Sequence, residues 1–203
     1  MMTYCTLFPS IIHLCEVDNY SDIEDELIDF VYKEHQSDPK GVVRSNGGGW
    51  QSEPKYHTFS NILNDTICKT LSTFFGDGQI WVNKLKYCID TEWININKKG
   101  DFNFNHLHPG ADLSGVFWIK VPSGTFQIDS PHAYTYSNHC RFYQNSFRDS
   151  TNNHVSFPIE PRDGTMLIFP SALYHAVEPN KSSEDRISAS FNLTLQDYDK
   201  KTI

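Results

Sequence analysis

The sequence lacks the features that mark several large classes of protein. No stretch of about 18 consecutive apolar residues occurs, so no membrane-spanning segment is expected. The first residues do not combine a basic region with an apolar core, so no signal peptide is expected either. The formal charge is −8 and the basic residues form no cluster, which argues against nucleic acid as a partner.

Two kinds of short motif are also missing. The five cysteines are scattered without a Cys-x-x-Cys pair, which predicts reduced thiols and a cytoplasmic protein rather than a zinc finger or a thioredoxin-like protein. The three glycines at 47–49 match neither phosphate-binding pattern, G-x-G-x-x-G or G-x-x-x-x-G-K-[ST]. The segment 41–52 is therefore either a surface loop or a lid over a site, with Trp50 as its apolar anchor.

The composition and the hydrophobic pattern predict a single domain over residues 1–203. The sequence is 38% hydrophobic, which is enough for a sizeable core. Apolar residues at helical spacing predict helices over 22–35 and 59–75. Residues up to about 78 would thus form a helical support for the rest of the chain.

From residue 79 to about 197 the pattern changes to the alternation typical of strands. The expected strands are 80–90, 92–97, 102–108, 114–121, 125–129, 165–169 and 186–195. Two helices followed by short strands predict a mainly β protein with flanking helices (α+β) and an antiparallel double-sheet core. The jelly roll is the expected architecture.

One expected strand carries two histidines. Successive side chains of a strand alternate between its faces, so His106 and His108 should point the same way, together with Phe102 and Phe104. Two imidazoles two residues apart can hold one metal ion from one side. The chain should then turn at Pro109-Gly110 and return as the next strand.

Two further regions offer polar groups. The last strand places polar residues on one face, which either meets water or lines a cavity inside the barrel; these are Arg186, Ser188, Ser190, Asn192 and Thr194. In a cavity, Arg186 would offer its guanidinium to a carboxylate, with the Ser188 hydroxyl beside it. His175 alone is an ordinary histidine, one of nine in the chain. Taken with the other two regions, it is a candidate third metal ligand.

Several blocks of sequence occur together in a familiar order. They are Asn46-Gly-Gly-Gly-Trp-Gln-Ser52, Trp93-Ile-Asn95, His106-x-His108-Pro-Gly, Leu113-Ser-Gly-Val-Phe-Trp, Gly164-x-Met-x-Ile-Phe-Pro-Ser-x-Leu-x-His175-x-Val and Arg186-Ile-Ser-x-Ser-Phe-Asn192. This set, spread over residues 44–195, resembles the small 2-oxoglutarate/iron(II)-dependent oxygenases. It is most similar to a branch found in marine bacteria and phages, so the cytoplasm would be the host's if the chain is phage-encoded.

The resemblance implies a double-stranded β-helix (cupin-like jelly roll) that holds iron(II) at its open end. It implies that His106 is the first iron ligand and His175 the distal one, and that Arg186 with Ser188 binds the far carboxylate of 2-oxoglutarate. The activity it implies uses molecular oxygen to convert 2-oxoglutarate to succinate and to hydroxylate a C–H bond. The substrate would be a small molecule or a protein side chain.

The chain departs from the family pattern at the position of the carboxylate ligand, where it has His108. His108 is a ligand in a three-histidine site, or Asp129 supplies the carboxylate from a neighbouring strand, or iron is bound weakly and the activity differs. We expect the first, with His106, His108 and His175 as the metal ligands. Three neutral imidazoles would leave the site more positive by one charge.

Two other functions compete with the oxygenase. One is a cupin-like three-histidine metalloenzyme that does not use 2-oxoglutarate, and the other is a non-enzymatic jelly roll with a structural role. Arg186-x-Ser188 favours the oxygenase over the cupin-like enzyme, which needs no clamp for a carboxylate, and the joint occurrence of the histidines and Arg186 favours both over a structural jelly roll. Specificity for the substrate should lie in the segments 41–52 and 130–156, which carry no chemical signature. The oligomeric state is open between a monomer and a homodimer.

Overall fold

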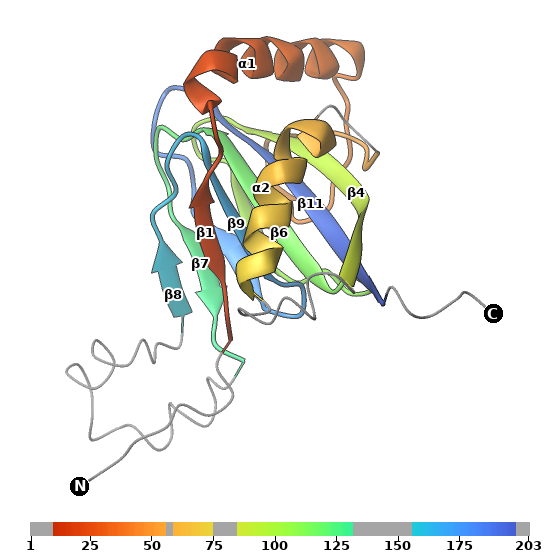
Figure 1. The fold of residues 1–203 in the computed structure, drawn as a ribbon. Helices are drawn as coiled ribbons and strands as arrows, with labels where there is room; N and C mark the ends of the chain where they lie inside the picture. Colours follow the sequence, from red (N-terminus) through yellow and green to blue (C-terminus); the bar gives the residue numbers. More distant parts are fainter. Residues whose placement is uncertain (1–9, 56–58, 75–84, 132–155, 198–203) are drawn as a thin grey trace, which may run out of the picture.

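Two antiparallel sheets stacked face to face form the body of the protein. The computed structural model describes residues 10–55, 59–74, 85–131 and 156–197 (Figure 1). The six-stranded sheet has the order β1 (His13–Glu16), β9 (Thr165–Pro170), β6 (Leu113–Lys120), β11 (Arg186–Asp197), β4 (Leu85–Asn97), β3 (Trp50–Gln51). The five-stranded sheet has the order β2 (Asn46–Gly47), β5 (Phe102–His106), β10 (His175–Val177), β7 (Phe126–Asp129), β8 (Ser156–Ile159). The predicted mainly β architecture is confirmed.

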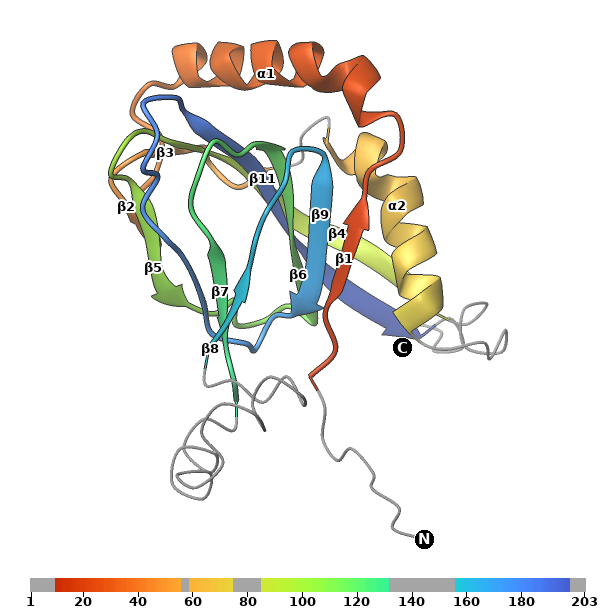
Figure 2. The same ribbon diagram turned by 90° about the vertical axis from the view of Figure 1, so that its left-hand side faces the viewer.

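Two helices cover the outer face of the six-stranded sheet (Figure 2). They are α1 (Tyr20–Ser37) and α2 (Phe59–Phe74), close to the predicted ranges. Their buried side chains share one apolar core with the sheet, and the helical members are Leu27, Val31, Phe59, Leu63, Ile67 and Leu71. In the described part of the chain, neither helix has the length and apolarity needed to cross a membrane.

The expected strands 80–90 and 92–97 form one strand, β4, as far as they are described. It pairs with β11 along its length, and the register shifts between Asn192 and Leu193. Thr91 lies opposite Asn192 and Ile89 lies opposite Leu193, so Asp90 is an extra residue in a β-bulge. The alternation of inner and outer side chains reverses at Asp90, which explains why the pattern resembles two strands.

The inner space between the two sheets is divided into an apolar part and a polar part. The apolar part is filled by Val116, Trp118, Phe126, Ile128, Ile159, Leu167, Phe169 and Leu173. The polar part lies between β4 and β11 of one sheet and β5 and β10 of the other, and it contains a pocket. The apolar filling closes one side of the sandwich, so the pocket is confined to the other.

The glycine-rich segment is a corner between the sheets rather than a free loop or a lid. The chain leaves the five-stranded sheet at β2 and enters the six-stranded sheet at β3. Gly48 and Gly49 take the positive φ values of 78° and 69° that this crossing requires. Trp50 is buried, and its indole N–H donates to the carbonyl of Asp38 (2.8 Å). The described residues before 79 thus supply three strands in addition to both helices.

Candidate metal centre and its pocket

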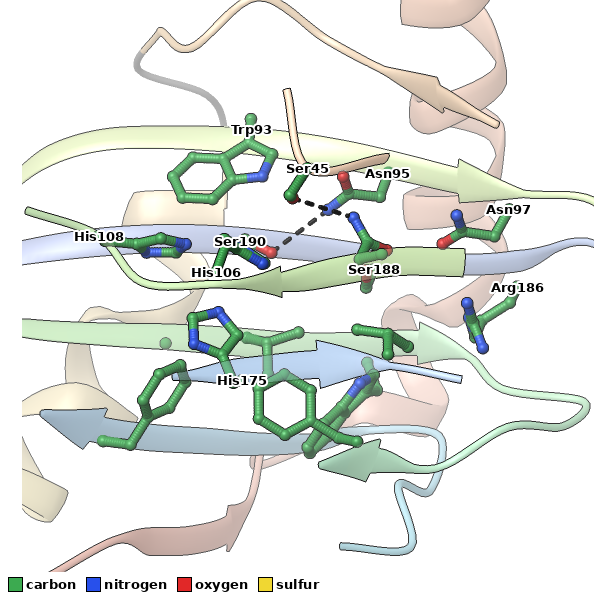
Figure 3. Close-up of a pocket in the computed structure, with 17 residues that line it drawn as sticks. Ser45, Trp93, Asn95, Asn97, His106, His108, His175, Arg186, Ser188 and Ser190 are labelled. Carbon is green, nitrogen blue, oxygen red and sulfur yellow. Dashed lines mark hydrogen bonds between the residues drawn. The ribbon is translucent and has the colours of Figure 1, made fainter. Parts of the chain in front are cut away.

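Three histidines meet in the pocket between the sheets (Figure 3). One ligand atom from each of His106, His108 and His175 can be chosen so that all lie within 4.8 Å of one another. His106 ends β5 and His175 begins β10, and the two are direct partners in the ladder of these strands. The ring centroids of His106 and His175 are 4.2 Å apart, and that of His108 lies 5.1 Å from His106 and 4.9 Å from His175.

A β-bulge in β5 sets which side chains face the pocket. His106 pairs with His175 but Asn103 pairs with Val177, so β5 has one residue more than β10 over this stretch. Asn103 therefore lines the pocket together with His106. The expectation that Phe102 and Phe104 share the face of the histidines was wrong. Their rings pack edge to face with each other, and Phe104 is 58% exposed.

The histidines on the strands are oriented by their own backbone. Nδ1 of His106 donates to the carbonyl of Phe104 (2.7 Å), and Nδ1 of His175 donates to the carbonyl of Leu173 (3.0 Å). A carbonyl only accepts, so the proton of each neutral ring is on Nδ1 and the lone pair is on Nε2. This is the usual arrangement for a metal-binding histidine, in which the other ring nitrogen is held by an oxygen.

His108 lies beyond the end of β5 and is held differently. Its Nδ1 is 2.8 Å from Asn192 Oδ1 on β11 and 2.8 Å from Ser114 Oγ on β6. The hydroxyl of Ser114 also donates to Asn192 Oδ1 (2.9 Å). Trp93 packs edge-on against the ring of His108, with centroids 5.3 Å apart.

The environment keeps the three imidazoles neutral. Burial lowers the pKa of His106, lowers the pKa of His108 to about 4 and lowers that of His175 to about 3. The repulsion expected between the charged rings adds to the effect of burial at His108 and His175. All three rings are therefore uncharged near pH 7 and offer lone pairs to a cation. The residues fit a first-row transition metal such as iron(II).

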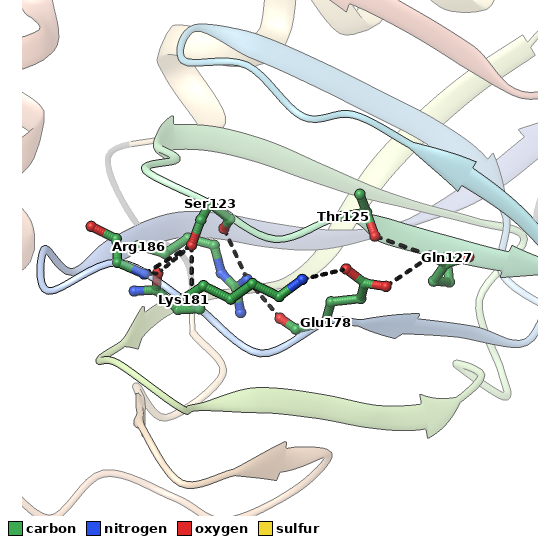
Figure 4. A network of polar contacts seen from close by, with 8 residues as sticks. Ser123, Thr125, Gln127, Glu178, Lys181 and Arg186 are labelled. Atoms are coloured by element: carbon green, nitrogen blue, oxygen red, sulfur yellow. Dashed lines mark hydrogen bonds and ion pairs between the residues drawn. The ribbon is translucent and has the colours of Figure 1, made fainter.

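Arg186 lies at the opposite end of the pocket and is 2% exposed. Its Nη1 donates to the carbonyls of Glu178 (2.8 Å) and Ser123 (3.3 Å), and its Nη2 donates to that of Asp101 (3.4 Å). Figure 4 shows this guanidinium beside the Ser123 turn and the backbone of Glu178. Burial lowers the pKa of Arg186 to about 10, so it remains charged near pH 7.

Arg186 forms no close ion pair among the described residues, and the more distant carboxylate of Asp101 offsets only part of the effect of burial on its pKa. The ion pairs of this region join other groups, such as the pair of Lys181 with Glu178 at 4.0 Å. None of the described side chains that line the pocket is a carboxylate. A buried guanidinium that is hydrogen-bonded to carbonyls and lacks a close ion pair is costly, and an anionic ligand would offset that cost.

The structure brings the five predicted site residues to one pocket. Ser188 lies one strand step from Arg186 on the inner face of β11, between Arg186 and the histidines (Figure 3). Asp129 is not brought to the histidines. Its carboxylate instead accepts from Asn105 Nδ2 (2.7 Å). The side chain of this strand that is buried in the apolar part between the sheets is that of the preceding residue, Ile128. The predicted substrate segment 130–156 lies almost entirely outside the described residues.

Ser190 was expected on the polar face of the last strand, but sequence reasoning assigned no site role to the other polar lining residues: Ser45, Trp93, Asn95, Asn97 and Asn103. The alternation of Trp93, Asn95 and Asn97 with two isoleucines is a usable signal for a polar inner face of β4. Ser45 and Asn103 carry no such signal, because the sheet corner and the β5 bulge bring them to the pocket. Ser45 Oγ accepts from Asn103 Nδ2 (3.3 Å).

Solved structures with this fold include several oxygenases. A prolyl-4-hydroxylase from Pseudomonas putida is 14% identical, with 90% of this chain and 92% of that chain covered and a TM-score of 0.56. A collagen prolyl hydroxylase from Paramecium bursaria Chlorella virus-1, solved as its 2OG complex, is 18% identical, with 90% and 94% covered and a TM-score of 0.51. The carbocyclase SnoK from nogalamycin biosynthesis is 9% identical, with 91% and 79% covered and a TM-score of 0.62.

These likenesses confirm the double-stranded β-helix fold that the sequence predicted. Among curated proteins, no sequence matches this chain. A family model described as "Putative 2OG-Fe(II) oxygenase" matches residues 91–192, just over half of the chain and the stretch that contains all three histidines and Arg186. The chain belongs to this family of 2-oxoglutarate- and iron(II)-dependent oxygenases.

Proposed function

We propose that this oxygenase is a hydroxylase that couples decarboxylation of 2-oxoglutarate to hydroxylation of a C–H bond, in a small molecule or a protein side chain of the cytoplasm. We assign iron(II) to His106, His108 and His175, and the far carboxylate of 2-oxoglutarate to Arg186 and Ser188. The observation that carries the proposal is the pocket itself. It has neutral imidazoles at one end, a buried guanidinium without a close ion pair among the described residues at the other, and no carboxylate among its described lining residues.

The side chains of the pocket would position the cosubstrate and exclude water. Arg186 would neutralise the far carboxylate, and the hydroxyl of Ser188 would donate to it. Phe126 stacks on His175 with centroids 5.4 Å apart, and Phe169 packs edge-on at 4.8 Å, so the wall behind that imidazole is apolar. Iron(II) held by the imidazoles would supply the redox chemistry that links the cosubstrate, oxygen and the substrate C–H bond.

The first test is an anaerobic titration of the iron(II)-loaded protein with 2-oxoglutarate, followed through the visible charge-transfer absorption of the chelate. We expect the absorption to develop in the wild-type protein and to be lost in His175→Ala, because that variant removes the buried ligand. His35→Ala is the control, because that histidine packs against Trp50 outside the pocket. Iron binding without the absorption would contradict the use of 2-oxoglutarate.

The second test separates the clamp from the metal ligands. Arg186→Ala should weaken 2-oxoglutarate binding to the nickel(II)-loaded protein by about 10- to 100-fold, since hydrogen bonds to charged groups contribute about 1.5–3 kcal/mol. Calorimetric titration measures this, and nickel(II) affinity should stay unchanged. Arg162→Ala is the matched control, because that arginine is 69% exposed and pairs with Glu16. Unchanged 2-oxoglutarate affinity in Arg186→Ala would remove the clamp from the proposal.

The three-histidine group itself favours a second candidate, a metalloenzyme that does not use 2-oxoglutarate. A set of three neutral ligands carries one negative charge fewer than two histidines with a carboxylate. The two candidates differ in the result of the first titration. Iron(II) binding to the wild-type protein with no binding of 2-oxoglutarate would favour the second.

A further inference from the structure

The third histidine lacks the backbone support that the other two have. His106 and His175 each donate to a carbonyl two residues earlier in the same segment of chain. His108 lies past the end of β5, and its backbone amide bonds to the carbonyl of Ser171 (3.0 Å). Its ring orientation therefore depends on side chains from the opposite sheet.

Two residues of the six-stranded sheet provide that support. Asn192 and Ser114 are direct partners in the β11–β6 ladder, and the Ser114 side chain is fully buried. Asn192 Oδ1 accepts from both His108 Nδ1 (2.8 Å) and Ser114 Oγ (2.9 Å). On its other side, Asn192 Nδ2 donates to Thr91 Oγ1 (3.3 Å). These contacts turn the amide oxygen, not the amide nitrogen, toward His108.

We propose that Asn192, oriented by Ser114, is the positioning residue that makes His108 a neutral metal ligand through Nε2. The inference rests on the proposed function, since it concerns the same metal site. An amide oxygen accepts the Nδ1 proton but carries no charge, so the ring is fixed without adding a carboxylate to the pocket. The reverse amide orientation would place the proton on Nε2 and block coordination.

The first experiment reads the position of the proton in the metal-free protein. Long-range 1H–15N correlation NMR distinguishes the two tautomers of each histidine. We expect His108 to carry its proton on Nδ1 in the wild type and in Ser114→Ala, where the amide oxygen remains. The double variant Ser114→Ala/Asn192→Leu removes both oxygens and should shift the proton toward Nε2. A wild-type His108 protonated on Nε2, or an unchanged tautomer in the double variant, would overturn the proposal.

The matched control for this experiment is Thr194→Val. Thr194 lies two residues along the same face of β11 and hydrogen-bonds Asp90 rather than a histidine. We expect the same His108 tautomer in Thr194→Val as in the wild type. A change as large as that of the double variant would mean that any polar loss on β11 disturbs His108, and the specific role of Asn192 would be wrong.

The second experiment measures cobalt(II) affinity and the visible spectrum of the bound ion. The double variant should bind cobalt(II) about 10- to 100-fold more weakly than the wild type, the usual cost of losing such support. Equal affinity would overturn the positioning role and leave the proposed function intact. Failure of the wild type to bind any metal would overturn both.

A further variant, at Asn192 alone, keeps the inference testable if the double variant does not fold. Asn192→Asp preserves the shape and the accepting oxygen but adds a charge. It should keep the Nδ1 proton on His108. It should also bind cobalt(II) at least as tightly as the wild type, because a carboxylate partner makes the imidazole a more basic metal ligand. Weaker binding with the fold retained would contradict the proposal.

Discussion

The two faces of the β4–β11 pair differ sharply, although both are formed by alternate residues of the same two strands. The face toward the helices carries Ile94, Ile96, Ile187, Ala189, Phe191 and Leu193, each at most 1% exposed. The face toward the pocket carries Trp93, Asn95, Asn97, Arg186, Ser188 and Ser190. One ladder of hydrogen bonds therefore fixes both a core and a candidate active site.

The difference shows where stability and chemistry are located. On the helix-facing side, each buried apolar side chain contributes about 1.5–3 kcal/mol to folding. Among the described residues of the pocket side, Arg186 is buried without a close ion pair and Asn95 Oδ1 is buried without a hydrogen-bond partner. Such groups cost stability, and the apolar face offsets that cost. Substitutions on the two faces should consequently change different measured quantities.

The largest expected effect is on the helix-facing side. Phe191→Ala should lower the free energy of unfolding by about 3–5 kcal/mol, because it removes a 1% exposed ring from the core. Urea denaturation of the metal-free protein measures this. Metal affinity of the folded variant should match the wild type. A loss of metal binding with stability retained would mean that the two faces are not separable.

A smaller effect is expected from overfilling the same side. Gly115 faces Phe191 across the β11–β6 ladder, and a Cβ at this position would overlap the phenyl ring. Gly115→Ala should lower the free energy of unfolding by about 1–3 kcal/mol. Adding Phe191→Leu should recover part of this loss, so the two changes should be non-additive in a double-mutant cycle. Strict additivity would show that the clash is relieved elsewhere.

A glycine on the pocket side should respond differently. Gly124 has a φ of 94°, and a Cβ there would overlap Arg186 Nη1. Gly124→Ala should displace the guanidinium and weaken 2-oxoglutarate binding about tenfold, or about 1.4 kcal/mol. Gly100→Ala is the control, because Gly100 has nearly the same φ (93°) but, apart from its chain neighbours, no atom of the described residues within 4 Å of the added Cβ. Equal losses of affinity in both variants would point to backbone strain rather than to Arg186.

The sequence predicted the features that depend on local periodicity. The helices followed from apolar spacing, and the polar face of β11 followed from strict alternation starting at Arg186, although alternation left open whether that face met water or a cavity. The meeting of the three histidines also followed, because His106 and His108 are two residues apart at the end of one strand and the resemblance to a family assigned His175 as the distal ligand. These signals need no knowledge of the partner strand.

The features that the sequence did not predict are set by partner strands. The bulge at Asp90 left a local signal that was interpreted as a break between two strands, and the bulge between Asn103 and His106 arises from register with β10, which no local pattern encodes. The same is true of the corner at Gly48, where the chain changes sheets. Likewise, the contact of Asn192 with His108 joins residues 84 positions apart.

The smallest effect, that of Ser188→Ala, is compared with a change at the adjacent residue, which lies on the opposite face. Ser188→Ala removes one neutral hydrogen-bonding group from the pocket and should weaken 2-oxoglutarate binding by about 0.5–1.5 kcal/mol, with little change in stability. The reciprocal change, Ala189→Ser, buries a hydroxyl among apolar side chains. It should lower the free energy of unfolding by about 1–3 kcal/mol and leave 2-oxoglutarate affinity unchanged. Calorimetric titration with 2-oxoglutarate and urea denaturation should be carried out on both variants. A loss of stability in Ser188→Ala together with a loss of 2-oxoglutarate affinity in Ala189→Ser would refute the division between the faces.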